Sequence, residues 1–472
     1  MKKIKKSYIL GSIESTREDI EPMTIVSEIL EKLKACQNLS EVEECFSLLF
    51  CELFIDYLGH CLELLDKFLI QSYLADGWTI DRLEERQLTF LFGTVTFKRR
   101  RLRKKDEKSF IPLDRALGLE PRQHFSPLFK EKIAQLSTGM TYRQAASSIE
   151  LLTNQTISHQ TVHTIAQSVA EKIQRTSEPE PRDKRKPEFL YIEADGVWIG
   201  SQEKGKHLEY KRGFIHEGVE KVGNRRCLIN PVYFGCFGTS KDLFEEIRTY
   251  LAIHYDLSRT LIIANSDGGS GYEADKFQSL GGRRSLFEYC LDSYHVMRYL
   301  TGKLGFDKFL QKELRQAVKA YNYERVELLL DTAESYLEQE EHLERLGEVR
   351  SYLTRNWCWL QPLKDRDLPV RDGVGVCESG HRYYTNRMKR QGRNWTRRGA
   401  ENMATLLVSI RNGEFESLYR ATVSEPVFRE EIAMSVSKAL KVIKHKEHTI
   451  PQATIPVYGA KSSAIGVLSG LF

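Results

Sequence analysis

Two aspartates stand where predicted strands end, each directly before a glycine. Asp195 follows the apolar run in EFLYIEADGVWIG, and Asp267 follows that in RTLIIANSDGG. In α/β sheets, reactive groups collect beyond the strand ends, where loops approach a substrate. Two neighbouring carboxylates repel each other unless a cation lies between them, and Mg²⁺ (or Mn²⁺) prefers such oxygen ligands. The pair therefore predicts a metal site that can act on a phosphodiester.

A third carboxylate would complete this site. Glu378 opens CESGHRYYTNRMKRQGRNW, a predicted helix so rich in arginine and lysine that DNA phosphates could approach its acid. Glu401, in GAENMATLL, is the competing third acid, and Asp292, in LFEYCLDSYHV, is a weaker candidate for an accessory metal ligand. Glu378 also has an ordinary structural explanation, because an acid in the first turn of a helix interacts favourably with the helix dipole.

The segment after Glu378 is also predicted to contact DNA. Its cations would bind phosphates, and its tryptophan could stack on a base, although a core position is the ordinary explanation for such a ring. The predicted contacts in this segment are Arg387, Lys389, Arg390, Arg393 and Trp395.

The elements that must position the acids follow the pattern β-β-β-α-β-α-β. Three hairpin-linked strands followed by α/β crossovers build a mixed sheet with helices on its faces, in the order of the ribonuclease H-like fold. The acids come after the first and fourth strands of this order. This placement is stronger evidence for a paired site than either Asp-Gly dipeptide alone, because Asp-Gly is a common turn. The predicted strands are 188–200, 207–219, 226–238, 259–269 and 286–296, and the helices are 240–255 and 272–280.

Composition and pattern divide the rest of this α/β chain. A polar, proline-containing linker at 174–187 precedes the core, and a long helical pattern follows its last strand. The expected segments are a helical N-terminal region (1–85), a basic β-hairpin segment (86–125), a helix-turn-helix region (126–175), a ribonuclease H-like core (188–300), a helical insertion (301–365), the end of the core with the third acid (366–420) and a C-terminal tail (421–472).

Two features before the linker point to DNA. The exit of the predicted hairpin, FKRRRLRKK, indicates either a solvated run that protects a sheet edge or an arm that contacts phosphates. Residues 142–152 and the helix after Ser158 are typical of a helix-turn-helix, with an ordinary helical hairpin as the alternative. The predicted contacts here are Arg99, Arg100, Arg101, Arg103, Lys104, Ser158, His159 and Gln160.

Bulk composition limits the classes of protein. The net charge of +5 over 472 residues is too small to indicate nucleic acid by itself. Nine scattered cysteines without a CxxC pair argue against a disulfide framework and a four-cysteine zinc site. The basic start is not followed by an apolar stretch, and we find no run near the ~20 apolar residues that span a bilayer. We therefore expect a cytoplasmic protein without a membrane partner.

Several blocks of the sequence resemble one family. EADGVWIG, NSDGGSGY, LDSYHVMRYL and CESGHRYYTNRMKRQGRNWTRRGAENMATLL are similar to the Lre-type bacterial insertion-sequence transposases, formerly grouped as an uncharacterised family and close to the Mutator-like DDE transposases. The likeness extends over most of the chain. It implies a catalytic triad of Asp195, Asp267 and Glu378 on a ribonuclease H-like core, a helical insertion before the glutamate, and dependence on Mg²⁺.

The resemblance also implies an activity and its partners. The expected enzyme cleaves DNA at the terminal inverted repeats of an insertion sequence and transfers the freed strand to target DNA, and the pairing of two ends suggests a homo-oligomer. A structure-selective nuclease of the same fold is one alternative, which strand-transfer products would exclude. A catalytically inactive, DNA-binding relative is the other, and it predicts unchanged function after Asp195→Asn.

Overall fold

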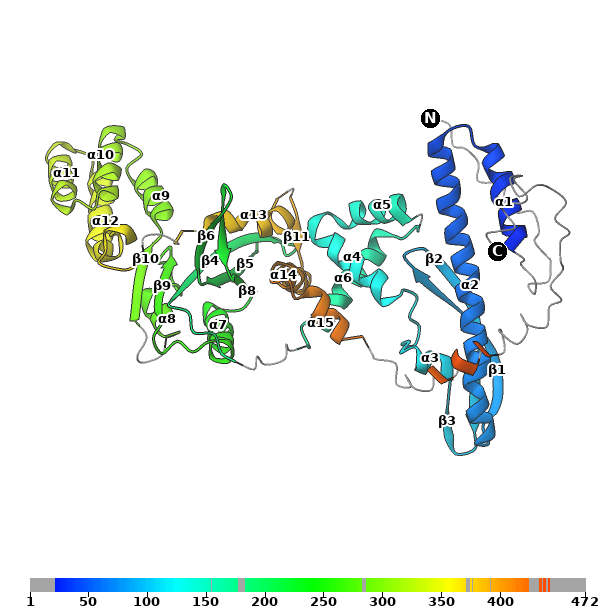
Figure 1. The fold of residues 1–472 in the computed structure, drawn as a ribbon. Helices are drawn as coiled ribbons and strands as arrows, with labels where there is room; N and C mark the ends of the chain where they lie inside the picture. Colours follow the sequence, from blue (N-terminus) through cyan, green and yellow to red (C-terminus); the bar gives the residue numbers. More distant parts are fainter. Residues whose placement is uncertain are drawn as a thin grey trace. The chain divides into compact units, whose positions relative to one another are not determined.

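The computed structural model contains two compact units, which Figure 1 shows as a ribbon. The N-terminal unit reaches Ser126 and takes in Thr153–Gln155, and the core unit comprises Pro127–Leu152 and Thr156–Val423. Most of the predicted tail, 421–472, lies outside the described residues. The structure describes residues 22–153, 155–176, 183–281, 286–370, 374–375, 377–390, 392–423, 433–434, 436–438 and 440–441, without the side chains of 22–28, 377–379 and 381.

Helices and an antiparallel sheet form the N-terminal unit, as the sequence predicts. The hairpin turns at residues 91–92, earlier than the expected Gly93-Thr94, because Phe90 already pairs with Gly93. A Cβ on Gly93 would lie 2.1 Å from Ile55 Cδ1, so only glycine allows the strand to approach the preceding helix. The elements are α1 (Pro22–Ala35), α2 (Leu39–Ala75), β1 (Thr79–Phe90), β2 (Gly93–Lys104), β3 (Glu107–Phe110) and α3 (Pro112–Ala116).

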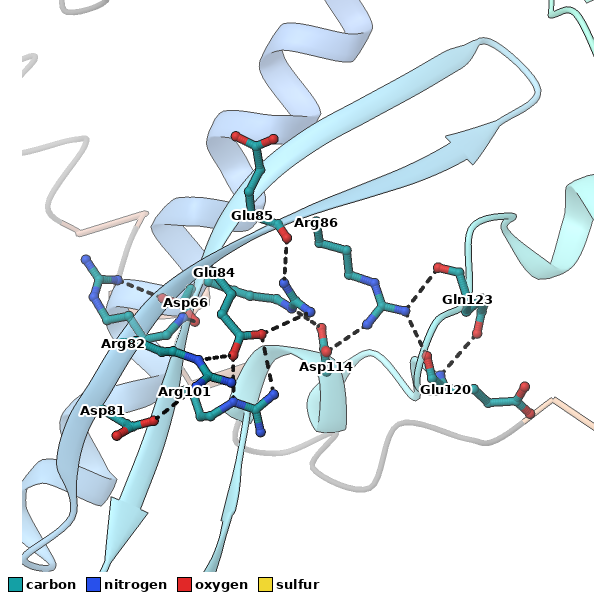
Figure 2. A network of polar contacts seen from close by, with 12 residues as sticks. Asp66, Asp81, Arg82, Glu84, Glu85, Arg86, Arg101, Asp114, Glu120 and Gln123 are labelled. Atoms are coloured by element: carbon teal, nitrogen blue, oxygen red, sulfur yellow. Dashed lines mark hydrogen bonds and ion pairs between the residues drawn. The ribbon is translucent and has the colours of Figure 1, made fainter.

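The predicted phosphate-binding arm on β2 is largely a set of internal ion pairs (Figure 2). Arg99 is 8% exposed and donates to Asp114 Oδ1 at 2.8 Å. Arg100 donates to the fully buried Asp66 at 2.7 Å, and Arg101 donates to Glu84, also at 2.7 Å.

For these three arginines the DNA-binding prediction is corrected, because their guanidinium groups already have carboxylate partners inside the unit. Arg103 and Lys104 remain accessible, with side chains 67% and 37% exposed. Position along β2 is the reason for the difference, since α2 and α3 cover its middle and leave its end to solvent.

The ion pair of Glu84 predicts a loss of stability in acid. The hydrogen bond from Arg101 is the largest cause that lowers the pKa of Glu84, from 4.5 to about 2. A depressed carboxyl pKa contributes stability above the ordinary value, and that stability disappears as the pH falls through the folded value. We expect Glu84→Gln to be less stable than the wild type at neutral pH, with a difference that shrinks between pH 4.5 and 2.

Chemical unfolding at a series of pH values measures this difference. Glu107→Gln is the matched control on the same sheet, because its ion pair with Lys104 is 48% exposed on the glutamate side. A Glu84→Gln difference that stayed constant down to the lowest pH would contradict the assignment.

By length and composition, α2 alone among the described helices could cross a membrane. The sequence analysis expected no such segment. The evidence for a span is weak, because Leu62 and Leu69 of the same helix pack against Val95 and Phe97 of β2. The helix also carries Asp66, whose buried carboxylate is paired with Arg100.

Three helices begin the core unit. The predicted helix after residue 141 is confirmed, and Ser158 caps the last helix by accepting from Thr161 N at 3.0 Å. The last helix buries Val162, Ile165 and Val169, whereas His159 and Gln160 in its first turn are exposed. The helices are α4 (Pro127–Gly139), α5 (Tyr142–Thr153) and α6 (His159–Ile173).

Six strands of the core unit form a mixed sheet in the order β10-β9-β4-β5-β8, with β11 beside β4. β9 runs parallel to both β4 and β10, whereas β5 is antiparallel to β4 and β8. The strands are β4 (Phe189–Ser201), β5 (His207–His216), β8 (Val232–Cys236), β9 (Leu261–Ser266), β10 (Leu286–Leu291) and β11 (Asn394–Trp395).

The predicted element pattern of the core is confirmed with one addition, but the predicted strand 286–296 ends at Leu291, because Asp292 caps a helix that begins at Ser293. The stretch 226–238 is not one strand, because it breaks at Asn230-Pro231 into β7 (Arg225–Ile229) and β8. Asn230 has a φ of 49° and Pro231 has no N–H to donate, so the ladder cannot continue. β7 pairs instead with β6 (Gly218–Val222) as a separate hairpin.

Helices cover the sheet on both faces. Leu190 and Ile192 of β4 pack against Ile247 of α7, in a core that continues into the helical insertion beside β10 (Figure 1). Val197 and Ile199 pack on the other face, against α13, β11 and α14. The helices are α7 (Ser240–His254), α8 (Ala274–Gln278), α9 (Ser293–Lys303), α10 (Lys308–Lys319), α11 (Tyr323–Tyr336), α12 (Glu340–Asn356), α13 (Cys377–Met388), α14 (Arg397–Arg411) and α15 (Phe415–Ala421), with 3-10 turns at Trp357–Trp359 and Leu363–Asp365.

Candidate active site

The strand register brings the two predicted aspartates to the same level of the sheet. Glu193 of β4 pairs with Asn265 of β9, so two residues further along each parallel strand lie Asp195 and Asp267. Asp267 directly follows β9, as predicted. Asp195, however, lies in the middle of β4 and not at its end, because β4 continues beyond β9 in its pairing with β5.

Both aspartates accept hydrogen bonds from backbone N–H groups. Asp195 is 9% exposed, and its Oδ1 accepts a hydrogen bond from Gly196 N at 2.6 Å. Asp267 Oδ1 accepts from Gly269 N at 2.8 Å, in a turn where Gly268 has a φ of 70°. Each carboxylate accepts a backbone hydrogen bond through Oδ1, and an ionised carboxylate can accept about four hydrogen bonds or ligand contacts through its two oxygens.

The negative charges of these aspartates affect the pKa of a neighbouring tyrosine. Burial is the largest cause that raises the pKa of Tyr272, and the negative charges of Glu209, Asp195 and Asp267 raise it further. Like charges so near each other favour either a bound cation or a nearby group of positive side chains.

Positive side chains surround the pair in a single pocket, which we call the acid pocket. It has a volume of about 740 Å³ and includes Asp195 and Asp267. Its cations come from α9, from α13 and from the turn after α13, which carries Lys389 and Arg390, two residues that the sequence analysis assigned to DNA. Further cationic and titratable residues of the pocket are His295, Arg298 and Arg382. The pocket therefore combines two acids with a rim that can bind phosphates.

Asp292 has a role in the structure of α9. Its Oδ1 accepts from Tyr294 N at 2.9 Å as the helix cap, and its Oδ2 lies 3.1 Å from His295 Nδ1. The register places Asp292 level with Asp267, since Cys290 pairs with Asn265. It is not among the described residues that line the acid pocket. The hydrogen bond to Asp292 is the largest cause that raises the pKa of His295.

The third acid depends on α13 and α14. Glu378 lies in the first turn of α13, and its side chain is outside the described part of the structure. Glu401 lies on α14, where it accepts from Arg397 Nε at 3.0 Å, and it does not line the acid pocket. Among the described residues no three His, Cys, Asp or Glu side chains form a group that could hold a metal ion. The two aspartates nevertheless supply the oxygen donors that Mg²⁺ prefers.

One predicted DNA contact, Trp395, is a core residue and is corrected, and Arg387 is buried away from the outer surface. Trp395 is 7% exposed and donates from Nε1 to Met388 O at 2.8 Å, in the core between α13 and α14. Arg387 is 4% exposed, and its guanidinium lies 4.9 Å from the Trp395 ring centroid. Arg393 donates to Asn386 O at 3.0 Å and is half-buried. Hydrophobic packing of β11 against β4 removes this part of the basic segment from the surface.

Trp198 is a residue of the acid pocket that the sequence analysis missed. It follows Asp195 by three positions on β4, lines the acid pocket and is 56% exposed. Its neighbours Val197 and Ile199 are buried, so a tryptophan stands at a position that strand alternation leaves to solvent. That alternation in EADGVWIG was the available signal.

Comparisons with known proteins agree on one family. A family model described as "Uncharacterised protein family (UPF0236)" matches residues 32–422. A UPF0236 protein in the vanSb 3′ region of Streptococcus gallolyticus is 62% identical over 444 residues, 94% of this chain and 99% of that protein. A UPF0236 protein of Caldanaerobacter subterraneus, whose name joins four loci, is 23% identical over 343 residues, 72% of this chain and 70% of that protein. The crystal structure of NurA with manganese is 10% identical over 56% of this chain and 66% of that chain, and its TM-score of 0.09 carries no argument about the fold.

Proposed function

The chain belongs to the uncharacterised protein family UPF0236, and we propose that it is a DDE transposase. In this proposal it cleaves DNA at the ends of an insertion sequence and joins the freed strand to target DNA. One observation carries the proposal: Asp195 and Asp267 stand level on adjacent parallel strands, inside a pocket rimmed with cations. Acids that gather below a phosphate-binding rim are what metal-dependent phosphodiester chemistry requires.

The topology supports a ribonuclease H-like core. Without the β6–β7 hairpin, the five main strands in chain order are β4, β5, β8, β9 and β10, and their spatial order is 3-2-1-4-5. The second strand is antiparallel to the first, and the fourth and fifth are parallel to it. In this order the first and fourth strands are neighbours, which is why their acids can share one site.

Two observations on α13 favour Glu378 as the third acid. Arg382 and Thr385 line the acid pocket, and Glu378 occupies the same helical face one turn earlier. A Cβ on Gly380 would lie 3.3 Å from Arg212 Nη1, and Arg212 is the partner of Asp195 in the β4–β5 ladder. The first turn of α13 therefore lies close to the strand position of Asp195.

Asp195, Asp267 and Glu378 would hold Mg²⁺ or Mn²⁺, which when bound lowers the pKa of an attacking water and neutralises charge on the phosphate. Lys389 and Arg390 would bind phosphate oxygens of the DNA. In the first step water adds to the phosphorus at the element end and the 3′-oxygen leaves as a hydroxyl. In the second step this hydroxyl attacks a phosphodiester of the target, whose own 3′-oxygen leaves, so no bond to the protein forms.

Other parts of the chain would hold the element end. The exposed first turn of α6, with Ser158, His159 and Gln160, supports the helix-turn-helix assignment, and the accessible Arg103 and Lys104 could bind phosphates. The reaction takes place on the chromosome, so we assign the protein to the bacterial cytoplasm, as a homo-oligomer that pairs two ends. One relative has a single name for four loci of one strain, and repeated copies are expected of a mobile element.

Substitution of each of the two candidate glutamates by glutamine tests the proposal. We expect Glu378→Gln to reduce end cleavage by roughly 10²-fold or more, because a metal ligand is lost. We expect Glu401→Gln to change it by less than about twofold, because its ion pair with Arg397 is exposed. The assay uses duplexes with the inverted repeats that flank the reading frame, with Mg²⁺, and separates cleaved from joined products.

The outcomes separate the rival functions. Joined products exclude a simple nuclease of the same fold, whereas hydrolysis without joining would support that nuclease. A reversed result, with loss only in Glu401→Gln, would move the third acid to α14. If neither substitution changed the function of the protein in the cell, a catalytically inactive, DNA-binding relative would be the remaining explanation.

Trp198 gives a separate prediction for DNA binding. Its exposed ring beside the acids can stack on a base, and such stacking contributes about 1–3 kcal/mol. We expect Trp198→Ala to weaken binding of the cleaved end by roughly tenfold or more, and Trp198→Phe to retain most of it. Fluorescence anisotropy in EDTA measures binding without cleavage, with Phe309→Ala, an exposed ring of α10, as the control. Unchanged affinity of Trp198→Ala would show that the ring does not touch DNA.

A further inference from the structure

A second pocket of the core unit contains a buried arginine without a carboxylate partner. Arg387 is 4% exposed, and its Nε donates to Ser137 O at 2.6 Å. Its Nη2 is buried and has no hydrogen-bond partner, and no Asp or Glu of the described residues forms an ion pair with it. Burial of a charge without a partner of opposite sign destabilises the fold by several kcal/mol. The position of Arg387 therefore indicates that an anionic ligand supplies the missing partner.

Two aromatic rings flank this arginine. Arg387 lies between the rings of Tyr142 and Trp395, with centroid distances of 5.0 and 4.9 Å. The Tyr142 hydroxyl is also buried without a hydrogen-bond partner. Burial lowers the pKa of Arg387 to about 10, so the guanidinium remains charged at neutral pH.

These groups line a cavity of about 420 Å³, which we call the Arg387 pocket. It also includes Arg393, His163 and the start of α14, where Thr396 caps the helix by accepting from Gly399 N at 3.1 Å. The N-terminus of this 15-residue helix adds a partial positive charge. No Asp or Glu occurs among the described residues that line the cavity. The pocket therefore offers donors and positive charge, and no competing anion.

We propose that the Arg387 pocket binds a phosphate group, and that this is a backbone phosphate of the DNA. The assignment to DNA rests on the function proposed above. It is favoured because one short segment contributes to both pockets: Arg387 lines this one, and Lys389 and Arg390, which follow Met388, line the acid pocket. Tyr142 and His163 come from α5 and α6, the two helices assigned to the helix-turn-helix. The pocket would hold the strand beside its reactive phosphate.

Inorganic phosphate tests the pocket without DNA. Thermal unfolding of the full chain is compared in sodium phosphate and in sodium chloride of equal ionic strength. We expect phosphate to raise the midpoint of the wild type by about 2 °C, and to raise it less in Arg387→Gln and in Tyr142→Phe. Tyr142→Phe removes only an unpartnered hydroxyl, so it keeps the test decisive should Arg387→Gln not fold. Arg248→Gln, an exposed arginine of α7, should respond like the wild type.

Labelled duplex DNA in EDTA tests the source of the phosphate. We expect Arg387→Gln and Tyr142→Phe to weaken binding, and Arg387→Gln to reduce the slope of log K against log salt by about one. A lost phosphate response with unchanged DNA binding would overturn the DNA assignment in favour of a free phosphate or nucleotide. No phosphate response in the wild type together with an unchanged slope would overturn the pocket and leave Arg387 as a packed cation. A normal phosphate response in a protein that cleaves no DNA would remove the transposase function and keep the pocket.

Discussion

Asp195→Asn and Asp267→Asn should each abolish DNA cleavage and strand transfer, with a loss of roughly 10³-fold or more. Asparagine has nearly the shape of aspartate and can still accept the backbone hydrogen bonds from Gly196 and Gly269. It lacks the negative charge that a divalent cation needs, so binding of the metal is lost while the fold remains. Quantitative assays of cleaved and joined products measure the effect.

A second readout separates a catalytic role from a structural one. Because the two carboxylates lie level and repel each other, we expect either substitution to leave thermal stability in EDTA unchanged or to raise it. Mg²⁺ should stabilise the wild type more than either variant, and DNA binding in EDTA should be retained. Asp275→Asn, with a side chain 69% exposed on α8, is the control and should behave like the wild type. Strand transfer at the wild-type rate by Asp195→Asn would end the DDE proposal.

Asp114→Ala should destabilise the N-terminal unit by about 3–5 kcal/mol. Asp114 joins two buried guanidinium groups, since its Oδ2 accepts from Arg86 and its Oδ1 from Arg99, at 2.7 and 2.8 Å (Figure 2). Both arginines are 8% exposed, so removal of the carboxylate leaves two charges in a poorly solvated place. Chemical unfolding of the full chain measures the loss.

A carboxylate of the same sheet provides the comparison for Asp114. Asp81 pairs with Arg103 at 3.6 Å, but that arginine is 67% exposed, so Asp81→Ala should cost about 1 kcal/mol or less. Asp114→Asn should lie between the two, because it keeps an acceptor without the charge. Equal, small losses in both alanine variants would mean that the arginines of β2 are solvated, and would restore them as candidates for DNA contacts.

Local patterns predicted most elements of this protein and the position of Asp267 after its strand. Ser158 caps α6 because a serine before an apolar helical run satisfies a free backbone N–H, and this depends on neighbouring residues alone. Likewise, the alternation of Leu88, Phe90, Val95 and Phe97 predicts a hairpin because its period is that of a strand. Asp267 was expected after β9 for the same reason, since an apolar run ends there.

Only the tertiary structure decided which charged and aromatic residues face solvent. The sequence contains the run of arginines on β2, but their fate depends on Asp66 and Asp114, which are distant along the chain and meet them through packing. Trp395 became a core residue because β11 pairs with β4, a contact between residues almost 200 positions apart. Periodicity along one segment carries no information about the partner that covers it, so register and burial required the assembled sheet.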